Sequence, residues 1–263
     1  MIYVASLAWL LINGRTGLRY SADTTDTILL WHPWLPVAVA MIPLLFAPRR
    51  RAEALEPARP APPWLAATLV AAAVGFAVVL KLLGPAEPVY TGAKLLLLVV
   101  VPLVALVVAR RSWEPTVRHT DIAPGWLWLA CGLWIAVSYL TPLAPRSVNL
   151  PYDLTTVVLI LLVGFAINAV VEEVFYRKVL IDRLLEWIGP WPAIIASSLL
   201  WSAWHIAIQG SDRVDLDLAQ VIMNQGVTGL LLGLLWVRGR SLAPLLIIHG
   251  LVNAAPILLG LLR

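Results

Sequence analysis

The chain has 263 residues, of which 60% are hydrophobic and only 13% are charged, against about 25% charged in soluble domains, so an ordinary soluble domain is excluded. The net charge of +4 comes from arginines that lie between apolar segments and form no basic face, so we expect no nucleic-acid partner. The single cysteine, Cys131, excludes an intrachain disulfide and a thiolate metal cluster.

Residues 2–13 are apolar but short, and they lack the basic start and the cleavage site of a signal peptide. They predict an interfacial helix or part of an extra span. Longer apolar windows follow, each close to the ~20 residues that a transmembrane helix needs. These windows are 28–47, 63–83, 93–109, 125–143, 155–176, 191–209, 218–237 and 242–262. We therefore predict an all-α fold: a polytopic transmembrane helix bundle of about eight spans in a single membrane domain.

Basic residues alternate between the loops, and cytoplasmic loops are the ones enriched in Lys and Arg. The rich segments follow the first, third, fifth and seventh windows. They contain Arg49, Arg50, Arg51, Arg59, Arg110, Arg111, Arg118, Arg177, Lys178, Arg183, Arg238 and Arg240. The pattern predicts that both termini lie outside the cell and that the fifth window ends inside.

Two adjacent acids, Glu172 and Glu173, lie in one of the most apolar stretches of the chain. An ionisable group at bilayer depth costs roughly 2.5–3.5 kcal/mol on insertion scales and indicates function. Glu173 and Arg177 are spaced i,i+4, which favours an ion pair, so Glu173 is predicted to be a structural anchor. Glu172 has no such local partner and lies i+4 from Asn168. It is the better candidate for a general base.

Two of the four histidines lie inside apolar windows of the C-terminal half. His205 lies i+4 from Trp201, so the indole can form a wall beside the imidazole. His249 lies i+4 from Asn253, and both can donate hydrogen bonds to one point. The other two, His32 and His119, are read as interfacial or solvated residues. With Glu172, the two intramembrane histidines form a candidate catalytic constellation.

These residues, in this order, resemble the CAAX protease and bacteriocin-processing family of intramembrane proteases. Glu172, Glu173 and Arg177 are similar to its Glu-Glu-x-x-x-Arg motif. Trp201 and His205 are similar to its Phe-x-x-x-His motif, with Trp in place of the usual Phe. His249 and Asn253 match its His-x-x-x-Asn motif. Lys178 stands where the family commonly has Gly. The resemblance covers about residues 155–258.

The resemblance implies that Glu172 and His205 activate a water molecule, while His249 and Asn253 stabilise the oxyanion, without a cofactor. Residues 151–263 would then be the catalytic core, and residues 1–150 would supply helices to which the sequence assigns no specific role. An alternative is a zinc enzyme in which Glu172, His205 and His249 are the metal ligands. That version needs another carboxylate as base, and the chain has no His-Glu-x-x-His motif.

The expected substrate is a protein or peptide in the lipid bilayer, whether lipid-anchored or C-terminally tagged, and the expected location is the inner membrane of a prokaryotic cell. Two other functions remain open. A non-catalytic scaffold or immunity protein would keep the fold but not need Glu172. A transporter would use Glu172, His205 and His249 as a proton relay, although the sequence shows no matched pair of broken helices.

Overall fold

The computed structural model describes residues 1–19, 27–49, 61–110, 122–211 and 213–261, and most of these are helical. The N-terminal elements are α1 (Ile2–Ile12), β1 (Gly17–Arg19), β2 (Thr27–Leu29), α2 (Trp34–Phe46), α3 (Pro63–Leu83), α4 (Val89–Leu95), η1 (Leu96–Val100), α5 (Val101–Ala109) and α6 (Pro124–Tyr139). The two strands form one short antiparallel pair in which Leu18 faces Ile28. Segments labelled η are π-helical, with wider turns than an α-helix.

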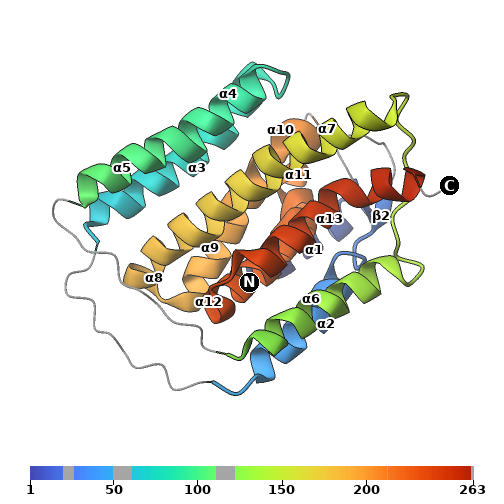
Figure 1. Cartoon of the computed structure of the whole chain (residues 1–263), viewed down its shortest axis with the longest axis horizontal. Helices are drawn as coiled ribbons and strands as arrows, with labels where there is room; N and C mark the ends of the chain where they lie inside the picture. The colour runs from blue at the N-terminus through green and yellow to red at the C-terminus, as the bar shows by residue number, and fades with distance from the viewer. Residues whose placement is uncertain (20–26, 50–60, 111–121, 212, 262–263) are drawn as a thin grey trace.

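The C-terminal elements are α7 (Leu154–Gly164), η2 (Phe165–Val170), η3 (Glu173–Ile181), α8 (Asp182–Ile188), α9 (Pro190–Ala203), α10 (Ile206–Gln209), α11 (Val214–Val221), η4 (Ile222–Gly226), α12 (Val227–Gly239) and α13 (Leu242–Leu261). Figure 1 shows how they are arranged. α7, η2, η3 and α8 join into one helix of 35 residues, and α11, η4 and α12 join into one of 26. Gly189, with a φ of 74°, separates α8 from α9.

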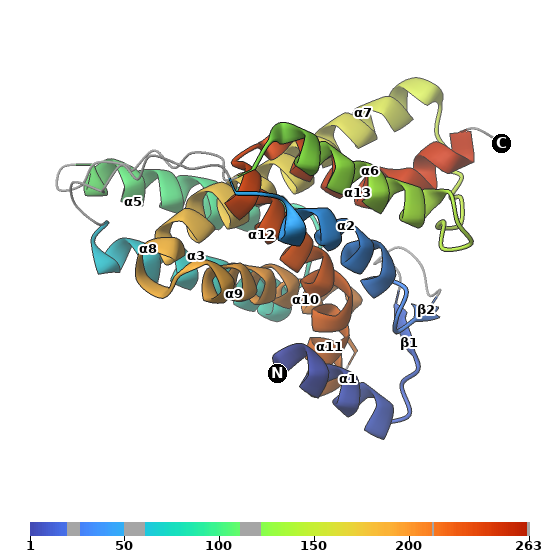
Figure 2. The same cartoon turned by 90° about the horizontal axis from the view of Figure 1, so that it is seen from below.

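The chain is a multi-pass membrane protein with an all-α fold, as the sequence predicts. Among the described residues, six helices are long and apolar enough to cross a membrane. They coincide with six of the eight predicted windows. The other two windows contain α2, with 13 residues, and α6, with 16 residues. Residues 2–13 form the short apolar helix α1, which lies beside α11 at the edge of the molecule (Figure 2).

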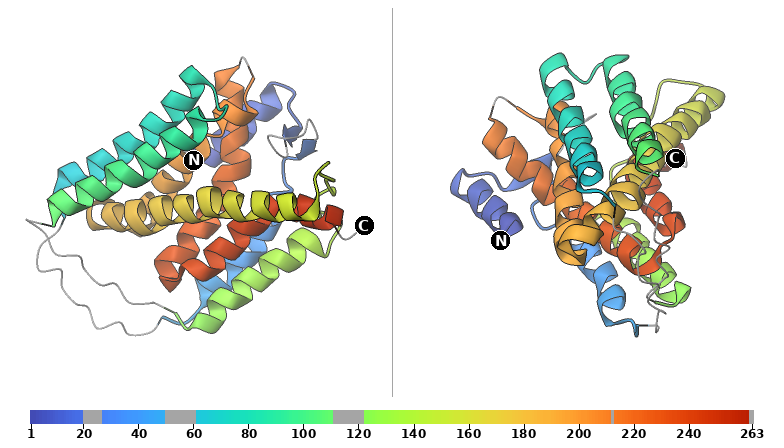
Figure 3. Two further views of the ribbon diagram at one scale, coloured as in Figure 1. Left: turned by 45° about the horizontal axis from the view of Figure 1, so that its top comes forward. Right: turned by 90° about the vertical axis from the view of Figure 1, so that its left-hand side faces the viewer.

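The long helix at Leu154–Ile188 runs across the molecule as a single rod, yellow to gold in Figure 3. Asp153 caps its start by accepting hydrogen bonds from the hydroxyl and the backbone N–H of Thr156, which lower the pKa of this exposed carboxyl. At 1.5 Å per residue the rod is about 50 Å long, which exceeds the ~30 Å hydrocarbon core. Its first half is apolar and exposed, whereas its second half is buried and carries the charged residues.

The N-terminal helices flank the C-terminal ones on two sides (Figure 1). α2 and α6 pack along each other and against α12 and α13. On the other side, α3 and the helix formed by α4, η1 and α5 make a hairpin that packs against α9 and η3. One apolar core includes residues from both halves, such as Phe76, Trp134, Trp201 and Leu231. The N-terminal hairpin is therefore close to the helix that carries the two acids.

α12 approaches α9 closely because two glycines face that neighbour. A Cβ atom added to Gly229 would lie 2.7 Å from the hydroxyl of Ser198, and one added to Gly233 would lie 2.9 Å from Ile194. Small residues four apart allow such close helix packing in membranes. This contact fixes the position of α9, which carries Trp201 near its end and is followed directly by Trp204 and His205.

Candidate active site

The helix around Glu172 departs from regular α-helical geometry. η2 ends two residues before Glu172, and η3 begins at the next residue, Glu173. π-helical turns occur often at functional sites, because the extra residue per turn changes the direction in which side chains point. Glu172 and Glu173 are both almost fully buried, at 1% and 0% exposure. Two buried carboxylates need partners, and the structure gives each a separate set.

The ion pair that the i,i+4 spacing predicts is present: Nε of Arg177 lies 3.2 Å from Oε2 of Glu173. Arg177 also donates to the hydroxyl of Ser197 on α9 at 3.0 Å, which links the two helices. The other oxygen of Glu173, Oε1, lies 2.7 Å from Nδ1 of His249. Glu173 therefore anchors Arg177 and also fixes the orientation of the His249 ring.

Glu172 is paired with a residue from the N-terminal half. Nζ of Lys94, on α4, lies 2.6 Å from Oε1 of Glu172. The same ammonium donates to the side-chain oxygen of Asn168 at 2.8 Å and to the hydroxyl of Tyr90. Tyr90 in turn donates to Asn168 at 2.9 Å. Asn168 and Glu172 thus share one helix face, as their spacing predicts, and Lys94 bridges them.

Trp201 lies at the centre of the cluster and contacts four of its members, Glu172, Arg177, His205 and His249. Its indole N–H donates to Oε2 of Glu172. Its ring centroid lies 5.2 Å from that of His205 and 5.4 Å from that of His249, in both cases edge to face. The Arg177 guanidinium lies 5.0 Å over the same indole. The indole of Trp201 therefore lies beside the His205 ring, as its spacing predicts, and it also lies beside the His249 ring.

The tautomer of each histidine follows from its hydrogen bond. Nδ1 of His205 lies 3.1 Å from the backbone oxygen of Trp201, and because a carbonyl only accepts, Nδ1 carries the proton. Neutral His205 therefore has its free lone pair on Nε2. Nδ1 of His249 donates to Glu173, so Nε2 of His249 is a donor only in the imidazolium form. Both rings are buried, and Trp204 stacks on His205 at 3.8 Å.

The Glu172 carboxylate interacts electrostatically with both His205 and His249. The hydroxyl of Tyr176, which is i+4 from Glu172, is buried and has no hydrogen-bond partner among the described residues. Buried polar atoms in native proteins normally bond to protein or to water. The face of the helix that carries Glu172 therefore offers one unused hydroxyl beside the carboxylate.

Asn253 differs from the other predicted site residues. It lies on α13 one turn after His249, but its side chain is exposed and makes no hydrogen bond to the described residues. The structure thus brings together Asn168, Glu172, Glu173, Arg177, Trp201, His205 and His249, and it does not bring Asn253 into their hydrogen-bond network.

The remaining histidines lie elsewhere. His32 is half-buried before α2 and packs edge to face on Trp31, and burial lowers its pKa. His119 lies outside the described residues, as do Arg50, Arg51, Arg59, Arg111 and Arg118 of the predicted topology.

Sequence reasoning missed Lys94, Tyr90 and Trp204. Lys94 is fully buried and lies within the span Val89–Ala109. The argument that singled out Glu172, an ionisable group in an apolar window, applies to Lys94 as well and would have found it. Tyr90 and Trp204 carry no comparable signal, because aromatic residues are common at membrane interfaces.

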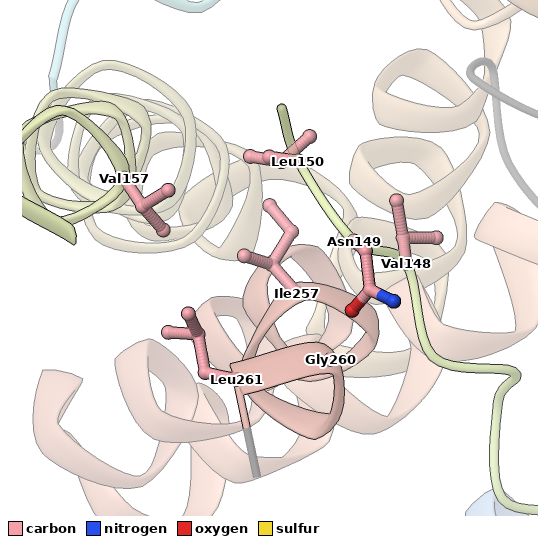
Figure 4. Close-up of a pocket in the computed structure, with 7 residues that line it drawn as sticks. All are labelled: Val148, Asn149, Leu150, Val157, Ile257, Gly260 and Leu261. Carbon is pink, nitrogen blue, oxygen red and sulfur yellow. The ribbon is translucent and has the colours of Figure 1, made fainter. Parts of the chain in front are cut away.

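Within the described residues, no group of three His, Cys, Asp or Glu side chains is arranged to hold a metal ion. A small cavity does exist, but it lies between the start of α7 and the end of α13 (Figure 4). It is lined by Val148, Asn149, Leu150, Val157, Ile257, Gly260 and Leu261. Val157 precedes Glu172 by about 22 Å of helix, so this cavity is not part of the charged cluster.

Residues 154–255 match the family model of the type II CAAX prenyl endopeptidase Rce1-like proteins. The matched segment begins at α7 and ends in α13, and it contains both acids, both intramembrane histidines and Asn253. Comparisons with curated proteins and with solved structures found no match to the chain. The family match supports an intramembrane protease whose substrate is a membrane-embedded protein.

Proposed function

Because residues 154–255 form an Rce1-like domain of the CAAX prenyl endopeptidase family, we propose that the protein is an endopeptidase in which Glu172 and His205 activate a water molecule. One observation carries this proposal. Glu172, His205 and His249 come from three separate helices and meet around one indole, that of Trp201. Such convergence of a carboxylate and two imidazoles in an apolar bundle provides a base, a proton carrier and a donor.

In the proposed reaction, the water oxygen attacks the carbonyl carbon of the scissile peptide while its proton passes to Glu172. A carboxylate has about four lone-pair sites, and Lys94 and Trp201 use only two of them, so Glu172 can still accept from water. Nε2 of neutral His205 is a second acceptor. The proton then moves to the leaving nitrogen, and the carbon–nitrogen bond breaks.

His249 and Asn253 are proposed to stabilise the oxyanion. For His249 this requires a proton on Nε2, because Nδ1 already donates to Glu173 at 2.7 Å, and that hydrogen bond holds the ring in place. A preorganised donor in a dry site lowers the barrier by about 3–4 kcal/mol. Asn253 is exposed one turn after His249 on α13, so we propose that its amide reaches the oxyanion when substrate is bound. Asn253→Ala should lower kcat about 100-fold with little change in KM.

We propose that no metal takes part. Both oxygens of Glu172 already bond to protein donors, and one of these donors is an ammonium group 2.6 Å away, which would repel a divalent cation. Nδ1 of His249 is also occupied by Glu173. Metal analysis of active, purified protein tests this proposal: stoichiometric zinc that is lost together with activity under chelation would overturn it.

The proposed substrate is a protein bound to the membrane by a lipid anchor or carrying a C-terminal tag, cut close to its membrane-associated end. The deciding experiment reconstitutes the full chain in liposomes and follows the cleavage of fluorescent peptides, with and without a C-terminal prenyl group, by mass spectrometry. Wild-type protein should cleave one of these two classes of peptide at a single bond. Glu172→Gln should lower kcat at least about 1,000-fold and leave the melting temperature unchanged.

Three outcomes would contradict part or all of this proposal. If Glu172→Gln cuts as fast as the wild type, Glu172 is not the base. If the wild type cuts nothing but carries protons across the liposome membrane, and Glu172→Gln stops this flux, the cluster is a proton relay. A native phenotype that survives Glu172→Ala would favour a scaffold.

The orientation in the membrane is also a proposal: both termini outside the cell, in the inner membrane of a prokaryotic cell, supported by the alternation of basic segments. Protease-cleavable tags at the two ends would test it. Removal of both tags by protease added to intact spheroplasts agrees with the proposed orientation, and protection of either tag contradicts it.

A further inference from the structure

Lys94 lies outside the residues that match the family model and is the only lysine buried in the part of the chain that the structure describes. We propose that Lys94 is a positioning residue for Glu172, and that the N-terminal hairpin formed by α3, α4, η1 and α5 completes the active site by supplying it. This inference rests on the endopeptidase proposed above. It gives the N-terminal half a defined part in the reaction.

The hydrogen bonds of Lys94 are fully used by protein groups. An ammonium group has three N–H donors, and those of Lys94 go to Oε1 of Glu172, to Asn168 and to Tyr90. The hydroxyl of Tyr90 also donates a hydrogen bond to Asn168, so the side-chain oxygen of Asn168 accepts two hydrogen bonds. No donor of Lys94 is left for a substrate. The residue therefore acts through Glu172 and not on the reacting atoms.

The surroundings of the ammonium favour a fixed cation. Nζ lies 4.2 Å from the ring centroid of Tyr90, 5.0 Å from that of Trp204 and 5.8 Å from that of Phe76. Aromatic faces within about 6 Å attract a cation. The three rings come from α4, from the end of α9 and from α3, so they join the N-terminal hairpin to the helix that carries His205.

The consequence for Glu172 is geometric. Lys94 holds Oε1 from the N-terminal half, and Trp201 holds Oε2 from α9. Two donors from different helices fix both the position and the plane of the carboxylate. Misplacing a catalytic group by about 1 Å can lower a rate 100-fold. Loss of Lys94 should therefore reduce the rate of the chemical step, even where the helices still assemble.

The test compares Lys94→Met, Lys94→Gln and Lys94→Arg in the liposome cleavage assay, with Lys81→Met as the matched control. Lys81 is an exposed lysine in the last turn of α3, in the same hairpin. We expect Lys94→Met and Lys94→Gln to lower kcat about 100-fold with KM within about threefold of the wild-type value. Lys94→Arg, which keeps the charge, should retain more activity than Lys94→Gln. Lys81→Met should behave like wild type.

A second readout does not depend on activity. Lys94→Met leaves Glu172 buried without its cation, so the melting temperature should fall. Lys94→Met/Glu172→Gln removes both charges and should recover most of that fall. Lys94→Gln keeps hydrogen-bonding capacity and serves where Lys94→Met does not fold.

The outcomes separate the two proposals. A folded Lys94→Gln with wild-type kcat would overturn the positioning role and leave the endopeptidase intact. If Lys94→Met/Glu172→Gln melts no higher than Lys94→Met, the destabilisation does not come from loss of the ion pair between Lys94 and Glu172. If wild-type protein cleaves no peptide, the endopeptidase fails and the positioning role with it, while the melting temperatures still report the pair.

Discussion

Glu172 and Glu173 are neighbours in the chain, but their partners lie in different parts of the molecule. Glu173 bonds to Arg177 of its own helix and to His249 of α13, both within the segment that matches the Rce1-like family model. Glu172 bonds to Lys94 of the N-terminal hairpin and to Trp201 of α9. Glu173 thus links helices within the matched segment, while Glu172 depends on the contact between this segment and the helices that precede it.

This comparison supports different proposed roles for the two acids. Glu173 is held at both oxygens, one by the Arg177 guanidinium and one by the imidazole N–H that it orients, so it serves to position His249. Glu172 receives one hydrogen bond at each oxygen and lies beside the unused hydroxyl of Tyr176. Both acids therefore accept one hydrogen bond at each oxygen, and they differ in what surrounds them: the Glu172 carboxylate interacts electrostatically with both His205 and His249, which supports its proposed role as the base.

The largest effect on stability is expected for Arg177→Met. It leaves Glu173 buried with only His249 as partner, and breaking a buried pair lowers the free energy of unfolding by about 3–5 kcal/mol. Chemical unfolding in detergent measures it. Arg177→Met/Glu173→Gln should be more stable than Arg177→Met alone; equal stabilities would mean that the pair contributes little and that the role of Glu173 lies elsewhere.

Glu173→Gln is expected to have the second-largest effect on stability, and it distinguishes the role of Glu173 from that of Glu172. It should lower the free energy of unfolding by about 2–3 kcal/mol, since a buried hydrogen bond to a charged group is weakened and Arg177 loses its counter-charge. Because the His249 ring loses the carboxylate that orients it, kcat should also fall, but less than in Glu172→Gln. The measurement is kcat per folded molecule beside the unfolding curve. A loss of activity as complete as that of Glu172→Gln would reverse the assigned roles.

Trp201→Phe is expected to have a smaller effect on catalysis. The ring between the histidines is kept, but the indole N–H that donates to Glu172 is lost, which corresponds to about 1.5–3 kcal/mol and at least a tenfold lower kcat. Trp191→Phe, at an exposed tryptophan of α9, is the matched control. Wild-type activity in Trp201→Phe would show that the hydrogen bond does not position Glu172.

Tyr90→Phe should produce the smallest change. It removes the hydroxyl between Lys94 and Asn168 but leaves the ammonium in contact with Glu172, so about 1 kcal/mol of stability is lost. Activity should stay within about threefold of wild type. A larger loss, seen in the same cleavage assay, would extend the positioning role from Lys94 to Tyr90.

The departure from the family motif at position 201 illustrates how far sequence reasoning extends. Trp in place of Phe looks mild in a sequence, because both are large aromatic residues. In the structure the indole N–H bonds to Glu172, which a phenyl ring cannot do. The substitution is therefore linked to the acid in a way that only the position of α9 reveals.

The sequence alone determined the parts of this protein that depend on local spacing. Apolar windows of about 20 residues specify membrane helices, because every backbone polar group must be bonded within the hydrocarbon core. The i,i+4 spacing predicted the pair between Glu173 and Arg177, the shared face of Asn168 and Glu172, and the contact between Trp201 and His205. These follow from helix geometry alone.

The tertiary structure decided the rest. The partner of Glu172 lies 78 residues earlier in the chain, and the partner of Glu173 on α13 lies 76 residues later. Such pairs depend on which helices pack together, and helix packing is set by shape, as where Gly229 and Gly233 admit α9. The two adjacent acids were evident from the sequence, but their different partners came only from the packing of the helices around them.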